Sequence, residues 1–224
     1  MQISADGSKQ MLDGKCVKIG DKLYVRVSVS HLSTFVVLGG RQMKFVDVAN
    51  HWAKIGIQYV FDRGIMSGTG ETKFSPDAKL SRAMLVTMLH NLEGAPKPGS
   101  AATFTDVEAG KWYADAISWA AANGIVSGVG EGKFAPNVEI TREQIATILH
   151  NYAKYKKYDT SKAGDLSVFA DSADISDWAL GALKWANGAG LIKGRTKSTM
   201  VPKGIATRAE AAVILTFFLE NVVK

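Results

Sequence analysis

One pattern of residues occurs three times along this 224-residue chain, and it limits the possible folds more than any other feature. Each copy has a Phe-x-Asp triplet, a tryptophan, a second aromatic, a Gly-rich stretch, an x-Pro segment and a Ser/Thr-Arg pair. From the tryptophan onward, copies one and two differ by a constant 60 positions, and copies two and three by a constant 66. Such repetition is typical of one supersecondary unit whose copies bury a shared core. The copies run through Phe45–Arg82, Phe104–Arg142 and Phe169–Arg208.

Each copy is expected to fold as helix, loop, helix. Two aromatics seven residues apart are two helical turns apart, which predicts that they share a face of the first helix; the pairs are Trp52 and Tyr59, Trp112 and Trp119, and Trp178 and Trp185. A glycine should end this helix in the left-handed conformation: Gly64, Gly124 or Gly190. The second helix should follow an N-cap at Ser81, Thr141 or Thr207. Gln144 and Glu210 complete capping boxes, whereas Met84 predicts a weaker first cap.

Residues 1–40 follow a different pattern. The stretch 22–30 alternates and is rich in β-branched residues, which predicts a strand, and 33–38 predicts another. Because two strands alone are marginally stable, we interpret 1–40 as the C-terminal remnant of an upstream β domain. The repeats are expected over 41–95, 100–155 and 165–224, joined by polar linkers.

Composition excludes several classes of protein. Cys16 is the single cysteine, so neither an internal disulfide nor a Cys-rich metal site is expected. No apolar run reaches about 18 residues, so membrane insertion is not expected. The net charge of +6 suits an acidic partner, but Lys and Arg do not cluster as in a nucleic-acid-binding arm. The polar start, Met1–Gln10, lacks the apolar core of a signal peptide, so an exported protein would make this chain a fragment of a longer precursor.

No catalytic residues, metal ligands or cofactor are predicted. The sequence contains none of the HExxH, GxSxG or Walker-type motifs, and its histidines do not form a catalytic set. Paired carboxylates such as Asp174 and Asp177 are not repeated. An enzyme is therefore the least favoured interpretation, and any catalysis would belong to an upstream domain.

Arg82, Arg142 and Arg208 directly follow the expected N-caps. A cation at a helix N-terminus opposes the helix dipole and costs on the order of a few tenths of a kcal/mol or more, so three at one register suggest a purpose. In one interpretation, the free N–H groups of the helix end and the guanidinium form an anion pocket. In the other, each Arg pairs with a nearby carboxylate and only holds the repeat together; the candidates are Asp47, Asp106 and Asp171. The residues leave both open.

Two further features also have two interpretations. Trp52, Trp112 and Trp178 have a helical spacing, which usually indicates core. They also lie at helix starts, where the rim of a groove would be, and an exposed indole stacks on a sugar ring. The second aromatics lie mid-helix and are expected in the core. The Gly-rich turns at 67–70 and 127–130 allow close approach of a ligand to the backbone, or are plain tight turns, the commoner case.

The ordered series Phe-x-Asp, Trp, Gly-hydrophobic-x-x-Gly, Phe-x-Pro and Thr-Arg-Ala-Glu resembles the S-layer-homology repeat. Residues 207–210 match the Thr-Arg-Ala-Glu motif, and 141–144 and 81–84 are looser versions. The resemblance covers about 41–224. It implies a mainly α fold in which three helix-loop-helix repeats form a pseudo-threefold module with a central three-helix bundle. A short β segment precedes it, and His31–Phe35 resembles the end of a bacterial surface β domain.

The resemblance also implies a function. Such modules bind secondary cell-wall polysaccharide, often bearing a pyruvate ketal, in grooves between repeats, and so hold surface proteins non-covalently on the bacterial cell wall. The expected location is therefore extracellular, at the cell wall or S-layer. The family's ligand-contacting residues map onto four sets of three, namely Arg82, Arg142 and Arg208; Asp47, Asp106 and Asp171; Trp52, Trp112 and Trp178; and Gly68, Gly128 and Gly194.

The third repeat departs from the pattern. Its loop, Lys193–Thr196, lacks the second glycine, and Met200 replaces an aromatic. Its groove is therefore altered or silent, or Lys193 and Arg195 strengthen anion binding. An alternative function is self-assembly with other surface-layer subunits, without direct glycan binding.

Overall fold

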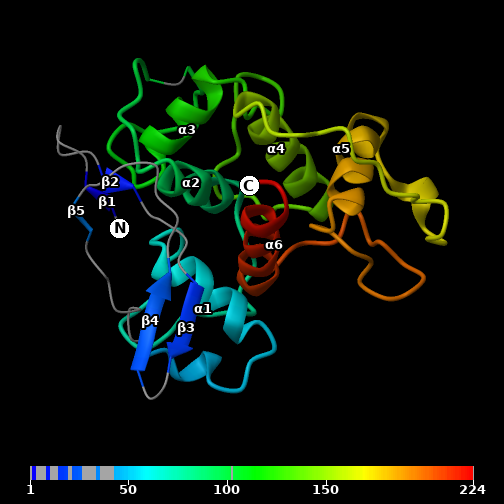
Figure 1. The fold of residues 1–224 in the computed structure, drawn as a ribbon. Helices are drawn as coiled ribbons and strands as arrows, with labels where there is room; N and C mark the ends of the chain where they lie inside the picture. Colours follow the sequence, from blue (N-terminus) through cyan, green and yellow to red (C-terminus); the bar gives the residue numbers. More distant parts are fainter. Residues whose placement is uncertain are drawn as a thin grey trace. The chain divides into compact units, whose positions relative to one another are not determined.

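The computed structural model describes residues 43–101 and 103–223 and, within 1–42, the backbone of five short strands (Figure 1). The chain divides into two compact units, Met1–Gln42 and Met43–Lys224.

In the first unit, β1 (Gln2–Ile3) pairs antiparallel with β2 (Lys9–Gln10) and β5 (Thr34–Phe35). A second antiparallel pair joins β3 (Lys15–Ile19) to β4 (Lys22–Arg26), with Val17 opposite Tyr24. The strand predicted over 22–30 is thus present over Lys22–Arg26, and the strand predicted over 33–38 over Thr34–Phe35. Residues 27–30, 33 and 36–38 lie outside the described residues. Assignment of 1–40 to an upstream domain stays a prediction.

The second unit is helical, so the mainly α fold predicted from the sequence is confirmed. Short 3-10 turns, Val46–Val48 and Ser172–Asp174, precede the first helices of repeats one and three. The α-helices among the described residues are α1 (Lys54–Asp62), α2 (Arg82–Leu92), α3 (Ala114–Ala122), α4 (Arg142–Tyr155), α5 (Asp177–Gly188) and α6 (Arg208–Asn221).

The helix ends follow the predicted signals. Gly64, Gly124 and Gly190 have φ of 69, 65 and 74°, the left-handed conformation expected where the first helices stop. The second helices begin directly after their N-caps. Complete capping boxes form at α4 and α6, whereas the Ser81 hydroxyl accepts only the Met84 amide at α2.

The expectation that each aromatic pair shares one helix face is wrong for the first two pairs, whereas Trp178 and Trp185 both lie in α5. Trp52 and Trp112 precede α1 and α3 in turns, and Trp178 lies in the first turn of α5. These three side chains are 65%, 59% and 58% exposed. Their partners behave as expected, because Trp119 and Trp185 are buried and Tyr59 packs partly buried against the core.

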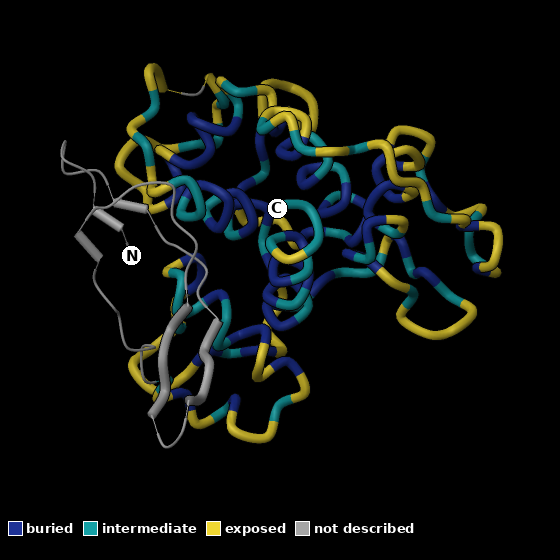
Figure 2. The backbone as a smooth tube through the Cα atoms, in the orientation of Figure 1, coloured by how far each residue is buried: buried dark blue, intermediate teal, exposed yellow. Residues whose placement is uncertain are grey.

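Helix packing occurs between repeats. The second helix of each repeat packs on the first helix of the next, α2 on α3 and α4 on α5, and α6 returns to α1. The last contact is close, since a Cβ on Gly56 of α1 would lie 3.0 Å from the Val213 side chain of α6. In Figure 2 the buried stretches of the second unit follow the helices, and the exposed ones follow the loops.

A ring of three backbone hydrogen bonds joins all three repeats. The amide of Leu80 donates to Ala206 at 2.9 Å, that of Ala206 to Ile140 at 3.0 Å, and that of Ile140 back to Leu80 at 2.8 Å. All three residues are fully buried and stand two positions before the helix-starting arginines. The contacts therefore close in a cycle. The pseudo-threefold symmetry and the central three-helix bundle stay predictions.

Candidate binding grooves

The arginines at the starts of the second helices connect neighbouring repeats. Arg82 of repeat one donates from Nε to the Phe134 carbonyl (3.0 Å) and from Nη2 to the Ser127 carbonyl (3.2 Å) of repeat two. Arg142 makes the same pair of bonds to Met200 (3.1 Å) and Lys193 of repeat three. Arg208 closes the cycle on Phe74 (3.0 Å) and Ser67 (2.7 Å) of repeat one. All three arginines are buried.

The aspartates of the Phe-x-Asp triplets hold the same peptide groups from the other side. Asp106 accepts the amides of Phe134 (2.8 Å) and Ala135 (2.7 Å), so Phe134 donates to Asp106 and accepts from Arg82. Asp47 and Asp171 repeat this arrangement with residues 74–75 and 200–201. We call each set of Asp, loop peptide and Arg from the preceding repeat a junction. Each Asp lies within its own repeat, and the Arg that faces it comes from the repeat before.

The electrostatics of the junctions follow from these bonds. Burial lowers the pKa of Arg82 and Arg208 below the ordinary value, partly offset by Asp106 and Asp47 respectively. Burial would raise the pKa of Asp106, but hydrogen bonds from the Phe134 and Ala135 amides hold it below its usual range. For Asp171, the Met200 amide is the main cause of the lowered pKa.

The helix N-termini are fully used within the protein. The first two amides of α2, of Arg82 and Ala83, donate to carbonyls of repeat two, those of Val138 and Pro136, and the third donates to the Ser81 hydroxyl. The starts of α4 and α6 are bonded in the same way. The expectation of free N–H groups forming an anion site is therefore wrong, because the next repeat supplies their acceptors.

The loop glycines allow close packing within their own loops; they are Gly68, Gly128 and Gly194. A Cβ on Gly128 would lie 2.7 Å from the Lys133 carbonyl oxygen and 3.1 Å from the Phe104 ring. At Gly68 and Gly194 it would lie within 3.0 Å of the corresponding Phe45 or Phe169 ring and of loop carbonyls. The need for glycine here is explained by close approach of the protein's own backbone and Phe ring.

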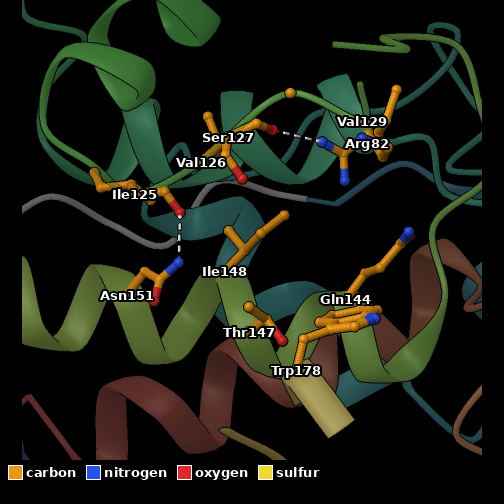
Figure 3. A pocket seen from close by; sticks show the side chains of 11 residues that line it. Arg82, Ile125, Val126, Ser127, Val129, Gln144, Thr147, Ile148, Asn151 and Trp178 are labelled. Carbon is orange, nitrogen blue, oxygen red and sulfur yellow. Dashed lines mark hydrogen bonds between the residues drawn. The ribbon is translucent and has the colours of Figure 1, made fainter. Parts of the chain in front are cut away.

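Beside the junction of repeats one and two lies a groove of about 360 Å³, the first groove (Figure 3). One wall is the loop Ile125–Val129 of repeat two. The opposite wall is a face of α4, and Trp178 of repeat three stands at its edge. Asn151 ties the two walls together through its bond to the Ile125 carbonyl (3.3 Å). The α4 face consists of Gln144, Thr147, Ile148 and Asn151.

The junction of repeats two and three carries a second groove of about 310 Å³. It has the same plan one repeat further along, with Trp52 at the edge, Arg142 at the junction, the loop 191–195 and a face of α6. The α6 face consists of Glu210, Val213, Ile214 and Phe217. By register, the corresponding residues at the third junction are Trp112, Arg208, Ser67, Gly68 and the α2 face at 84–91.

Each groove therefore combines an exposed indole with the arginine of its junction, and Arg195 is a second arginine in the second groove. Arg82 lines the first groove and Arg142 the second. In both, Nε and Nη2 are bonded to carbonyls, while Nη1 has no hydrogen-bond partner among the described residues. Asp47, Asp106 and Asp171 line neither groove and hold loop amides instead.

The helix faces that line the grooves were not predicted as site residues. On α4 they stand at positions 144, 147, 148 and 151, the spacing of one helix face. That spacing is visible in the sequence. These positions do not stand out when the repeats are aligned, because Thr147 and Asn151 are replaced by Val213 and Phe217 in the third repeat.

The sequence model of the S-layer homology domain matches three stretches of the chain, 44–83, 103–146 and 168–212. Each stretch contains one Phe-x-Asp triplet, one exposed tryptophan and one helix-starting arginine. The chain belongs to the S-layer homology domain family. The predicted three tandem repeats are confirmed.

Relatives of the module occur in proteins of different kinds. The chain is 36% identical over 182 residues to "Exoglucanase XynX" of Acetivibrio thermocellus, covering 81% of this chain and 17% of that protein. It is 36% identical over 179 residues to "Amylopullulanase" of Thermoanaerobacterium thermosulfurigenes (79% and 10%). It is 33% identical over 189 residues to "Surface-layer 125 kDa protein" of Lysinibacillus sphaericus (83% and 16%). The chain thus spans less than a fifth of each relative.

The S-layer homology domain is a non-catalytic module that anchors proteins at the cell surface, and its partners are cell-wall components. The chain is therefore a cell-surface, cell-wall-associated anchoring module. Within the part of the chain that the structure describes, no helix is long and apolar enough to cross a membrane. The same residues contain no group of three or more His, Cys, Asp or Glu side chains placed to hold a metal ion.

Proposed function

We propose that this S-layer homology module tethers a surface protein by binding an acidic secondary cell-wall polysaccharide, bearing a pyruvate ketal, in its grooves. Binding is reversible, and no covalent bond forms or breaks. The three repeats are related by a pseudo-threefold axis, with α2, α4 and α6 as the central bundle. This arrangement is supported by the cyclic order of the junctions and by the ring joining Leu80, Ile140 and Ala206.

The observation that carries the proposal is the exposure of three tryptophans at one register of the repeats. An indole is a large apolar surface that folding normally buries, yet Trp52, Trp112 and Trp178 are all more than half exposed at one register. Two of them line grooves that also hold an arginine. A flat apolar ring beside a cation is the chemistry that a sugar bearing a carboxylate requires.

A repeating polymer suits a module with several grooves. Once one sugar unit is bound, the next groove meets the same polymer at high effective concentration, so the grooves add avidity without new contacts. The glycan contact residues proposed are the three tryptophans, the free Nη1 atoms of Arg82, Arg142 and Arg208, and the loop backbones at Gly68, Gly128 and Gly194. Asp47, Asp106 and Asp171 act indirectly, by holding those loops.

The test is adsorption of the full chain to isolated cell-wall sacculi, before and after chemical removal of their acidic polysaccharide. Trp52→Ala and Trp178→Ala should each weaken adsorption about tenfold, a loss of about 1.4 kcal/mol. Val138→Ala is the matched control, because Val138 is an exposed apolar residue that lines neither groove. Thermal unfolding of each variant checks that the fold is retained. Unchanged adsorption of both tryptophan variants would rule out the grooves as the wall-binding surface.

Self-assembly with other surface-layer subunits is the second candidate. It is supported by the similarity to the Lysinibacillus surface-layer protein. Under this alternative, stripped and intact sacculi would adsorb the chain equally, and the chain would sediment as oligomers in the absence of wall.

A further inference from the structure

The two grooves share one plan but differ at the residues that would face a ligand. In the loops, Ser127 and Val129 of the first groove correspond to Lys193 and Arg195 of the second. On the helix walls, Thr147 and Asn151 of α4 correspond to Val213 and Phe217 of α6, and Gln144 to Glu210. At these positions the first groove thus presents neutral side chains, most of them able to form hydrogen bonds, and the second presents charges, a valine and a second aromatic ring.

Most of the charges in the second groove are already paired. Arg195 donates to the Glu210 carboxylate, from Nε to Oε1 at 3.2 Å and from Nη2 to Oε1 and Oε2 at 3.1 Å each. Its Nη2 also donates to the Ile205 carbonyl at 2.7 Å. Glu210 additionally accepts the Thr207 amide as part of the capping box. Arg142 is buried with two donors on carbonyls.

Lys193 differs from these groups. Its carbonyl takes part in the junction, but its side chain is exposed and lines the second groove. Its ammonium lies 5.6 Å from the centre of the Phe217 ring and forms no ion pair with any described residue. Among the described residues, Lys193 is therefore the cation of this groove whose charged group is not hydrogen-bonded, and it lies over the ring of Phe217.

The first groove offers a different set of unused groups. Arg82 is the one ionic residue among those that line it. The Gln144 side-chain oxygen accepts the Thr141 amide, which leaves its NH₂ group available, and Asn151 uses its NH₂ group on Ile125, which leaves its oxygen. Donors and acceptors of this kind match the hydroxyl and amide groups of a neutral sugar.

We propose that the two grooves bind different units of one polymer. The second groove takes the unit with the acidic substituent, with the sugar ring against Trp52 and Phe217 and the anion on Lys193. The first groove takes a neutral unit against Trp178. This inference rests on the proposed function, since it assigns parts of the same glycan to separate grooves.

The tryptophan side chains allow each groove to be observed separately by NMR. The indole N–H resonances of Trp52 and Trp178 report the second and first grooves, while the buried Trp119 and Trp185 report the fold. Trp-to-Phe variants assign the signals. The probes are a hexose methyl glycoside bearing a pyruvate ketal and the same glycoside without it, titrated into the full ¹⁵N-labelled chain.

The acidic glycoside is expected to shift the Trp52 signal at about five- to tenfold lower concentration than the Trp178 signal. Lys193→Gln should abolish this preference, and Lys197→Gln, an exposed lysine of the same loop outside both grooves, should retain it. Ser127→Lys should give the first groove affinity for the acidic probe. The neutral glycoside should shift Trp178 in every variant.

Four results would overturn the inference. If the acidic probe shifts Trp178 at least as readily as Trp52, or if Lys193→Gln has no effect, the assignment of grooves is wrong while glycan binding stands. If the neutral probe favours Trp52, the first groove is not the neutral site. If neither probe shifts either indole although intact sacculi still adsorb the chain, groove binding fails, and the proposed function fails with it.

Discussion

The junctions and the groove walls lie side by side, but the three repeats conserve one and vary the other. Every junction has an aspartate and an arginine at the same register, and the arginine donates to two loop carbonyls. The residue whose carbonyl accepts from Nε differs, being Phe74, Phe134 or Met200. The groove walls share Trp, Arg, Gly and several apolar positions, whereas the positions of Ser127, Val129, Gln144, Thr147 and Asn151 change from polar to apolar or from neutral to charged. The junction residues recur in every repeat and hold neighbouring repeats together. The positions that vary lie on the groove walls, where we propose that they decide which unit of the glycan each groove binds.

Removal of a junction arginine should have the largest effect on the fold. Arg142→Ala leaves the carbonyls of Met200 and Lys193 without their donors in a buried place and removes the guanidinium that faces Asp171. We expect the free energy of unfolding to fall by about 2–4 kcal/mol. Urea unfolding followed by circular dichroism measures it. Lys203→Ala, at an exposed lysine, should change stability by less than about 0.5 kcal/mol. Equal stability of both variants would contradict a structural role for the junctions.

This expectation alters how binding losses are interpreted. An arginine-to-alanine variant that no longer adsorbs to walls has lost a junction as well as a cation. The exposed tryptophans and Lys193 are cleaner probes, because neither supports the neighbouring repeat through its side chain.

The loop glycines come next in expected effect. Gly68→Ala would place a Cβ 2.4 Å from the Phe45 ring and 2.7 Å from the Lys73 carbonyl oxygen, so the loop must shift. The cost is expected at about 1–3 kcal/mol in thermal or urea unfolding. Gly70→Ala, two residues away in the same loop, meets nothing within 4 Å and should be nearly neutral. If the two variants unfold alike, close packing is not the reason for glycine at residue 68.

Acidification should weaken the junctions by a smaller amount. The pKa of Asp106 is lower in the folded state than its ordinary value of 3.8, so its stabilising contribution is complete above that value. It is lost as the pH falls through the lower, folded-state pKa, when the carboxylate is protonated. Stability measured from pH 5 to pH 2 should therefore fall, and Asp106→Asn should reduce the slope. A slope unchanged by this substitution would show that Asp106 does not contribute to acid sensitivity.

The smallest expected effect is a gain in stability. Ala135 donates to Asp106 from a left-handed backbone with φ of 61°, and Ser75 and Val201 have φ of 56 and 53° at the same register. Glycine adopts this conformation without a Cβ penalty, so Ala135→Gly should stabilise the protein by up to about 0.5–1 kcal/mol. Ala121→Gly, inside α3, should instead destabilise it by about 0.5–1 kcal/mol. Loss of stability in both variants would mean that the left-handed backbone is not strained at residue 135.

Local signals in the sequence predicted the helices well. The N-caps at Ser81, Thr141 and Thr207 and the stops at Gly64, Gly124 and Gly190 are confirmed, because each depends on residues a few positions apart. The predicted helical position of Trp52 is wrong, because two residues seven apart share a face only if both are helical. A turn ahead of α1 removes that condition.

The spacing of residues in the sequence could not predict which repeat contacts which. Asp47 and Arg82 recur together, which suggested a pair within one repeat, but Asp47 faces Arg208 instead. The partner comes from 161 positions away along the chain, and periodicity is the same whether a repeat contacts itself or its neighbour. The filled helix N-termini have the same origin, since the carbonyls that accept from α2 belong to Val138 and Pro136.

The return of α6 to α1 has a mechanical consequence. In an open array of repeats, a pull at one end can peel off the terminal unit and leave the rest intact. Here the last repeat holds the first through Arg208 and through the Leu80–Ala206 bond, so no repeat is terminal in the closed cycle. Tension applied at the N-terminal end of repeat one must break contacts with repeats two and three together. A module built this way should unfold in a single event at high force. Single-molecule pulling would then record one rupture peak for the three repeats.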